Sequence, residues 1–181
     1  IINERFAFYN KKFNLNEEKI RKFLSCTKPL LYSNKPKSFR LIAVNKNLCR
    51  KLMKLGVIPK KSLIVDFPKV PKRYLRHFIR GIIDGDGSVN YFKRERSPYF
   101  AIRIASGSQN FLEKLVKRIK KETNITSKVK RVHGNTFQVS YTCKRAKGLA
   151  TWIYKDANIF LDRKFKNYLI MKKLEVVVPD K

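Results

Sequence analysis

Acidic residues, cysteine motifs and long hydrophobic runs are all scarce in this chain. Of its 181 residues, 13 are Asp or Glu and three are Cys, and the cysteines have no C-x-x-C spacing. This disfavours a disulfide framework or a structural zinc site, and we expect buried free thiols at Cys26, Cys49 and Cys143. No apolar run approaches the roughly 20 residues of a membrane span, so we expect an intracellular protein of the cytoplasm or an organelle, without a membrane partner.

Basic residues are abundant instead. The chain has 43 Lys and Arg against 13 Asp and Glu, a formal net charge of +30, and 43% of its residues are hydrophobic. That hydrophobic fraction is sufficient for a core, so we expect a folded protein. Phosphate backbone offsets the self-repulsion of such a charge and releases counterions on binding. Because the basic residues are spread along the whole chain, nucleic acid is favoured over a membrane surface.

The predicted elements occur in the same order twice. A helix, two strands and a helix are predicted over residues 15–26, 29–33, 38–44 and 47–55, and again over 109–123, 127–132, 136–142 and 145–154. The second copy is preceded by a helix over 72–84 and strands over 88–93 and 99–105, whereas the first is preceded by a single strand-like segment at 5–9. This repetition predicts two related half-domains, 1–70 and 71–181. The first is expected to be truncated: either its front end lies in upstream sequence, or this copy has lost it.

The strands of the second copy alternate between apolar and polar residues. In the strand over 99–105, Phe100, Ile102 and Ile104 share one face and Arg103 lies on the other. A sheet with helices on one side and polar, basic residues on the other can enter a DNA major groove; the alternative is a solvated sheet face. On the first interpretation, the residues expected to contact DNA in both copies are Arg5, Arg40, Asn90, Arg94, Arg103, Lys128, Lys130, Gln138 and Ser140.

The helix predicted over 72–84 ends in two aspartates, Asp84 and Asp86, among glycines. A helix C-terminus carries partial negative charge, so we expect a cation there, with Mg²⁺ completed by DNA phosphate as the main hypothesis. The alternatives are a glycine-rich turn with solvated aspartates and a calcium loop, although Val89 stands where the calcium loop needs glycine. Gly81 and Gly85 lie four residues apart, which would let another helix approach closely.

The segment Ile79-Arg80-Gly81-Ile82-Ile83-Asp84-Gly85-Asp86-Gly87 resembles the signature of the LAGLIDADG homing endonucleases. The resemblance implies an α+β fold of two pseudo-symmetric αββαββα half-domains, whose sheets form a saddle on DNA. It also implies roles for single residues. Asp86 matches the metal-binding catalytic acid, Asp84 a residue that structures the helix end, and Gly81 and Gly85 the interface between the motif helices. Lys164 resembles the basic residue near the active site, with Lys61 as its counterpart in the first copy.

The function that this resemblance implies is a site-specific endonuclease that makes double-strand breaks in a long DNA target. We expect double-stranded DNA as partner, Mg²⁺ as cofactor with Mn²⁺ or Ca²⁺ able to substitute, and an intron-encoded monomer if a first motif lies upstream. A two-half enzyme needs one acid for each strand, however, and this sequence has one signature. Two alternatives therefore stay open: a maturase that binds its own intron RNA, and a catalytically inactive DNA-binding derivative of the fold.

Overall fold

The computed structural model describes residues 5–10, 21–22, 25, 27, 31–34, 37–56, 65–93 and 98–174. The chain divides into two compact units, Ile1–Ile58 and Pro59–Lys181. The described residues 65–70 therefore group with the second unit, whereas the sequence analysis placed them with the first. Each unit is described by itself below.

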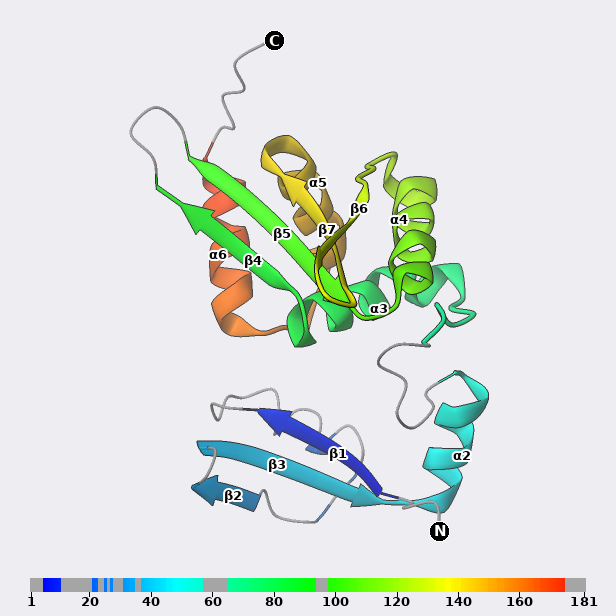
Figure 1. Ribbon diagram of the computed structural model, residues 1–181. Coiled ribbons are helices and arrows are strands. Elements are labelled where there is room, and N and C mark those ends of the chain that lie inside the picture. The colour runs from blue at the N-terminus through cyan, green and yellow to red at the C-terminus, as the bar shows by residue number, and fades with distance from the viewer. Residues whose placement is uncertain are drawn as a thin grey trace. The chain divides into compact units, whose positions relative to one another are not determined.

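The second unit combines one antiparallel sheet with helices. Its elements are α3 (Lys72–Gly85), β4 (Ser88–Phe92), β5 (Tyr99–Ser106), α4 (Gln109–Thr123), β6 (Val129–His133), β7 (Thr136–Thr142), α5 (Cys143–Tyr154) and α6 (Asp162–Lys173). The strands follow the order β4-β5-β7-β6, and the helices pack against one face of the sheet (Figure 1). The predicted α+β class and the predicted αββαββα order are confirmed, and α6 follows as an additional helix.

The core lies between the sheet and these helices. Phe100, Ile102 and Ile104 of β5 are buried, as the alternation of apolar residues predicted. Helix α4 begins at its N-cap Ser108, whose hydroxyl accepts a hydrogen bond from the Phe111 N–H, and ends at Asn124 in the left-handed conformation. The apolar stripe of this helix is buried against the sheet. Local capping and long-range burial therefore agree for this helix, which explains why its predicted bounds are correct.

The first unit contains a smaller sheet. Its described elements are β1 (Arg5–Asn10), β2 (Leu31–Asn34), β3 (Lys37–Val44) and α2 (Lys46–Lys54). The antiparallel order β1-β3-β2, followed by a helix, repeats the order β5-β7-β6 followed by α5 in the second unit. The predicted internal repeat is thus present in the strand order. Counterparts of α3 and β4 are not among the described residues of this unit, and most of the helix predicted over 15–26 lies outside them.

Three further observations concern the sequence predictions. Helix α6 was not predicted from the residue pattern, because Lys164 lies on its buried side together with Tyr168 and Met171. Cys49 and Cys143 are free thiols but are only half-buried, which corrects the expectation of buried thiols; Cys26 lies outside the described residues. Within the described part of the chain, no helix has the length and apolar character required to cross a membrane.

Candidate functional site

Helix α3 has one buried face and one open face. Leu75, Ile79 and Ile83 recur at four-residue spacing and are fully buried in the core. Gly81 and Gly85 are exposed, and a Cβ atom added to either would meet no atom within 4 Å. The two glycines thus leave space beside α3 for a close neighbour. That a second helix occupies this space remains a prediction.

The C-terminus of α3 is held by a lysine from α6. The Lys164 Nζ atom donates hydrogen bonds to three backbone carbonyls, of Ile83 at 2.6 Å, Asp84 at 2.8 Å and Gly87 at 2.6 Å. The side chain is only 1% exposed. Burial, and then the charge of Arg163, lower the pKa of Lys164 to about 8. A protein cation thus lies at this helix end, and all three of its N–H groups are occupied by backbone carbonyls.

Asp84 is held inside the second unit. Its Oδ1 atom accepts a hydrogen bond from the Tyr154 hydroxyl at 2.8 Å, and its Oδ2 atom accepts one from the Leu161 N–H at 3.1 Å. Burial raises the pKa of Asp84, while these two hydrogen bonds oppose the rise. The carboxylate ties the end of α3 to the end of α5 and to the segment before α6. It is not presented to a ligand.

Arg80 belongs to the same buried cluster and was missed in the sequence. Its Nε atom donates to the Ile159 carbonyl and its Nη1 atom to the Ile153 carbonyl, both at 2.9 Å. The side chain is buried, which lowers the pKa of its guanidinium. Arg80, Asp84 and Lys164 together fasten α3 to the C-terminal part of the unit. The signal available in the sequence was a cation directly beside the apolar stripe of α3.

Asp86 differs from these residues because it is exposed. It is the C-cap of α3, and its N–H donates to the Ile82 carbonyl at 2.9 Å. Its carboxylate makes no hydrogen bond or ion pair among the described residues. No group of three or more His, Cys, Asp or Glu side chains within the described ranges is arranged to hold a metal. Asp86 can therefore contribute one carboxylate ligand to a metal whose other ligands come from elsewhere.

Gly87 fixes the position of Asp86 next to the sheet. A Cβ atom added to Gly87 would lie 2.9 Å from the Cα and carbonyl oxygen of Ile83 and 3.0 Å from the carbonyl oxygen of Arg103. These neighbours are backbone atoms and cannot move aside cheaply. Glycine is thus required where the end of α3 approaches β5. The backbone directly after Asp86 is held against β5 as a result.

Five predicted DNA-binding residues share the sheet face opposite the core. Residues directly opposite one another on antiparallel strands lie on the same face. Arg103 pairs with Ser88 and with Ser140 in one row, and Gln138 pairs with Ala105 and with Lys130 in another. A further row contains Asn90, Ala101 and Thr142. The structure therefore brings together Asn90, Arg103, Lys130, Gln138 and Ser140.

Ser88 and Thr142 lie on this same face and were not among the predicted residues, although the strand alternation contained the signal. The Asn90 side-chain amide donates to the Ser88 hydroxyl at 3.2 Å. Ser88 follows Asp86 by two residues, so the acidic helix end adjoins the polar face. We define the polar sheet face as Ser88, Asn90, Arg103, Lys130, Gln138, Ser140 and Thr142.

The remaining predicted site residues are not brought into this group. Lys128 is exposed and precedes β6. Arg40 pairs with Tyr9 and Leu31, and Arg5 pairs with Val44, in the sheet of the first unit. Lys61 and Arg94 lie outside the described residues.

The second unit combines an acid at the end of a core helix with an antiparallel sheet that has one polar face. Residues 73–161, from α3 to the segment before α6, match the family described as LAGLIDADG-like domain. Over these residues, the second unit is similar to the LAGLIDADG-like domain family.

Solved structures share the fold over nearly the whole chain. The meganuclease I-SmaMI, bound to uncleaveable DNA with a TTCT central four, is 12% identical, with a TM-score of 0.61 over 93% of this chain and 80% of its own. The homing endonuclease I-LtrWI, bound to target DNA, is 12% identical, with a TM-score of 0.55 over 93% of this chain and 77% of its own.

A third similar structure is not called a homing endonuclease or meganuclease. Full-length DUF199/WhiA from Thermatoga maritima is 17% identical, with a TM-score of 0.57 over 98% of this chain and 55% of its own. At these identities the likeness shows the fold alone. A coverage of 93% or more exceeds what the second unit could supply by itself, so each match extends into the first unit. No curated protein matches the chain in sequence.

Proposed function

We propose that this chain binds duplex DNA through the polar sheet face and cleaves it as a site-specific homing endonuclease. The observation that carries the proposal is the position of Asp86, an exposed acid whose carboxylate has no hydrogen bond or ion pair among the described residues, next to Ser88 of that face. I-SmaMI and I-LtrWI, which have the same fold, are DNA-bound meganucleases or homing endonucleases. The net charge of +30 suits a phosphate backbone.

The polar sheet face has the side chains that base recognition requires. An arginine such as Arg103 can pair with the O6 and N7 atoms of guanine, and the amides of Asn90 and Gln138 can pair with the N6 and N7 atoms of adenine. Lys130 is exposed in the edge strand β6 and can contact phosphate. A twisted antiparallel sheet presents these groups as rows, which fits a major groove.

Asp86 is the residue that would hold a divalent cation, and Mg²⁺ suits it, because Mg²⁺ is commonly bound by one or two carboxylates together with phosphate oxygens and water. When bound, such an ion polarises the phosphodiester and lowers the pKa of bound water. The residues of this chain supply the position of the acid. Gly87 lets the helix end approach β5, and Lys164 fastens the three carbonyls around it. We therefore assign Lys164 a positioning role.

A second candidate function is DNA binding without cleavage. Of the two acids at the end of α3, only Asp86 is free to bind a metal, because Asp84 accepts hydrogen bonds from Tyr154 and Leu161. Cleavage of two strands requires an acid for each strand. The ammonium of Lys164 is also fully occupied by backbone carbonyls, so it does not reach a phosphate in this arrangement.

The two candidates are separated by incubating the full chain with a plasmid library that carries a randomised target cassette, in Mg²⁺ and in EDTA. The endonuclease proposal requires linear products in Mg²⁺ and none in EDTA. Asp86→Asn should abolish cutting and leave DNA affinity within about tenfold, because the carboxylate serves the metal more than affinity. Selective binding without cutting would establish the second candidate, and cutting by Asp86→Asn at the unmodified rate would refute the assignment of Asp86.

Base recognition by the polar sheet face has its own test. Arg103→Ala and Gln138→Ala should each reduce discrimination at particular base pairs by about 1 to 3 kcal/mol. Arg145→Ala is the matched control, because Arg145 is exposed on α5, on the helical side of the sheet. Sequence selection from the randomised library gives the readout. Identical base preferences in all three variants would exclude this face as the recognition surface.

A further inference from the structure

A basic groove lies on the helical side of the second unit, between the coil at residues 65–71 and helix α4. Its volume is about 590 Å³. One wall is formed by Phe67, Pro68, Lys69, Val70 and Pro71, and the other by Lys114, Lys117 and Arg118. We call this site the α4 groove. The function proposed above makes no use of it.

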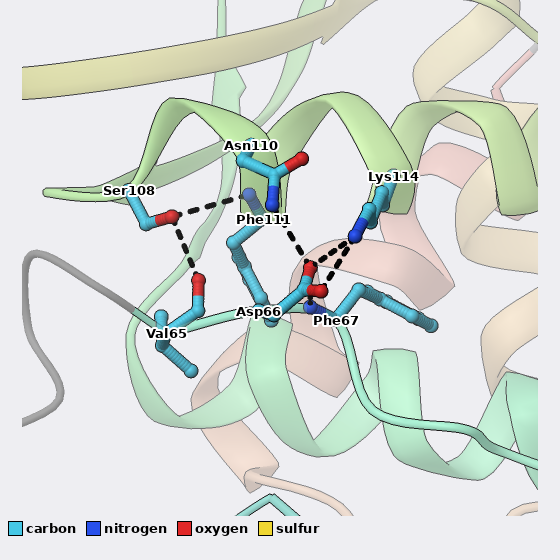
Figure 2. A network of polar contacts seen from close by, with 7 residues as sticks. All are labelled: Val65, Asp66, Phe67, Ser108, Asn110, Phe111 and Lys114. Carbon is cyan, nitrogen blue, oxygen red and sulfur yellow. Dashed lines mark hydrogen bonds and ion pairs between the residues drawn. The ribbon is translucent and has the colours of Figure 1, made fainter.

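The coil is fastened to α4 at its beginning. The Ser108 hydroxyl donates to the Val65 carbonyl at 2.7 Å. Both oxygens of the Asp66 carboxylate accept hydrogen bonds from the Lys114 ammonium, at 2.7 and 2.5 Å. The Asp66 Oδ1 atom also accepts one from the Asn110 amide at 3.1 Å (Figure 2). The contact with Lys114 lowers the pKa of Asp66. This wall of the groove is therefore a positioned segment.

The end of the coil is fastened as well, because Arg118 Nη2 donates to the Val70 carbonyl at 2.8 Å. The ring of Phe67 lies 5.5 Å from that of Phe78 and 5.7 Å from that of Phe111, measured between centroids. Phe67 is thus part of the packing between the coil, α3 and α4. The groove has two walls whose backbone positions are set by the fold.

The charge of the groove is positive and partly unused. Lys114 neutralises Asp66, the nearest acid of the coil. Lys69 and Lys117 are exposed, and neither makes a hydrogen bond or ion pair among the described residues. Arg118, whose Nη2 atom donates to the Val70 carbonyl, lines the groove together with these two lysines. Apolar surface from Pro68, Val70 and Pro71 lies next to these cations.

The α4 groove is remote from the polar sheet face. Helix α4 buries Phe111, Leu112 and Leu115 in the core, so it covers the face of the sheet opposite Arg103 and Gln138. Duplex DNA has a persistence length of about 50 nm, far longer than a domain of this size, so a duplex on the polar sheet face does not bend back to α4 without strong deformation. A ligand in the groove is therefore a separate molecule or a flexible strand.

We propose that the α4 groove binds a single-stranded nucleic acid segment. Lys69, Lys117 and Arg118 contact its phosphates, and unstacked bases or sugars lie against Pro68 and Val70. A duplex keeps its bases inside and offers only phosphates, so it leaves the apolar part of the groove without a partner. This proposal does not depend on the endonuclease function, since it uses none of the residues assigned to that function.

The test uses the full chain with labelled oligouridine RNA and oligothymidine DNA of about 12 nucleotides, within the usual range of single-strand site sizes. Chemical acetylation of lysines, read by mass spectrometry, locates the bound strand. Lys69 and Lys117 should be protected by either oligonucleotide, and Lys120, which is exposed on α4 outside the groove, should not. Because this footprint uses the unmodified protein, it does not depend on the folding of any variant.

Fluorescence anisotropy of variants gives the second measurement. Lys69→Gln/Lys117→Gln should weaken single-strand binding roughly 25-fold at about 0.1 M salt, because each phosphate contact contributes a log-log slope of about 0.7. The matched control, Lys120→Gln/Lys144→Gln, removes two exposed lysines outside the groove and should have a much smaller effect.

Three results would overturn the proposal: equal weakening by the two double variants, equal acetylation of Lys69 and Lys117 with and without the strand, or equal protection of these lysines by a duplex. If RNA and DNA strands bind equally, the groove contacts only the features that both backbones share. A preference for RNA indicates contact with the 2′-hydroxyl, and both results support a single-strand site.

Duplex binding by Lys69→Gln/Lys117→Gln should stay within about twofold of the control, since the sheet contacts are intact. Loss of duplex binding by Arg103→Ala alone concerns the proposed function and leaves this inference unaffected.

Discussion

The buried end of α3 and the polar sheet face both contain charged and polar residues, but the two regions differ in whether these side chains have partners within the protein. At the helix end, Lys164, Asp84 and Arg80 each have intramolecular partners for their charged groups. On the sheet, the side chains of Arg103, Lys130 and Gln138 make no hydrogen bond or ion pair among the described residues. Buried polar groups must be satisfied within the protein, whereas polar groups left open can serve a ligand. The first region is therefore expected to determine stability and the second recognition, with Asp86 at the boundary.

The largest expected effect on stability is that of Lys164→Met. The substitution removes the donor for three carbonyls at a buried helix end, and each unsatisfied buried acceptor costs about 1 to 3 kcal/mol, so we expect a loss of roughly 3 kcal/mol or more. Urea denaturation followed by circular dichroism measures it. Lys166→Met, at an exposed position of the same helix, is the control and should change stability by no more than about 0.5 kcal/mol.

Gly87→Ala should have the next largest effect. We expect the free energy of unfolding to fall by about 1 to 3 kcal/mol, because the new methyl group clashes with the backbone of Ile83 and Arg103. Gly85→Ala adds the same methyl group where no atom lies within 4 Å. Inside helix α3 it should be neutral or stabilise by up to about 1 kcal/mol. Equal melting temperatures for the two variants would contradict the close approach of α3 to β5.

Substitutions of the two aspartates should also differ in their effect on stability. Asp84→Asn leaves one acceptor for two donors, the Tyr154 hydroxyl and the Leu161 N–H, so we expect a loss of about 1 to 2 kcal/mol. Asp86→Asn should change the free energy of unfolding by less than about 0.5 kcal/mol, because its carboxylate is exposed. Thermal unfolding of both variants at neutral pH measures the difference. A greater loss for Asp86→Asn would reverse the assignment of structural and functional acids.

A last comparison concerns the dependence of stability on pH. The pKa of Lys164 is lowered from 10.5 to about 8 in the folded protein. Between these values the unfolded chain binds more protons at this group than the folded chain, so this group makes stability rise as the pH increases through that window. Lys164→Met lacks the titrating group. The difference in unfolding free energy between the unmodified protein and this variant should therefore grow from pH 8 to pH 10, and parallel curves would show that Lys164 does not titrate differently in the two states.

Much of the fold could be predicted where local pattern and burial coincide. The bounds of α4 and β7 follow from periodicity, capping and alternation, because the residues that set them are close in sequence. Helix α6 could not be predicted in this way, since its buried side includes Lys164, whose partners are carbonyls about eighty residues earlier. For the candidate site, the strand alternation predicted five members of the polar sheet face. Arg80 and Tyr154 were missed, because no local pattern relates them to Asp84 or to the ends of α5.

The sequence by itself determined the excess of positive charge, the two-fold order of elements, the alternation that makes one sheet face polar, and the acids at the end of α3. It could not distinguish the surroundings of Asp84 and Asp86, which stand two residues apart among glycines. Only the tertiary structure decided that Tyr154 and Leu161 bind Asp84, that Lys164 occupies the helix end, and that Asp86 stays exposed. The physical reason is that periodicity depends on neighbours along the chain, whereas the partner of a buried charge is set by which distant segments pack together.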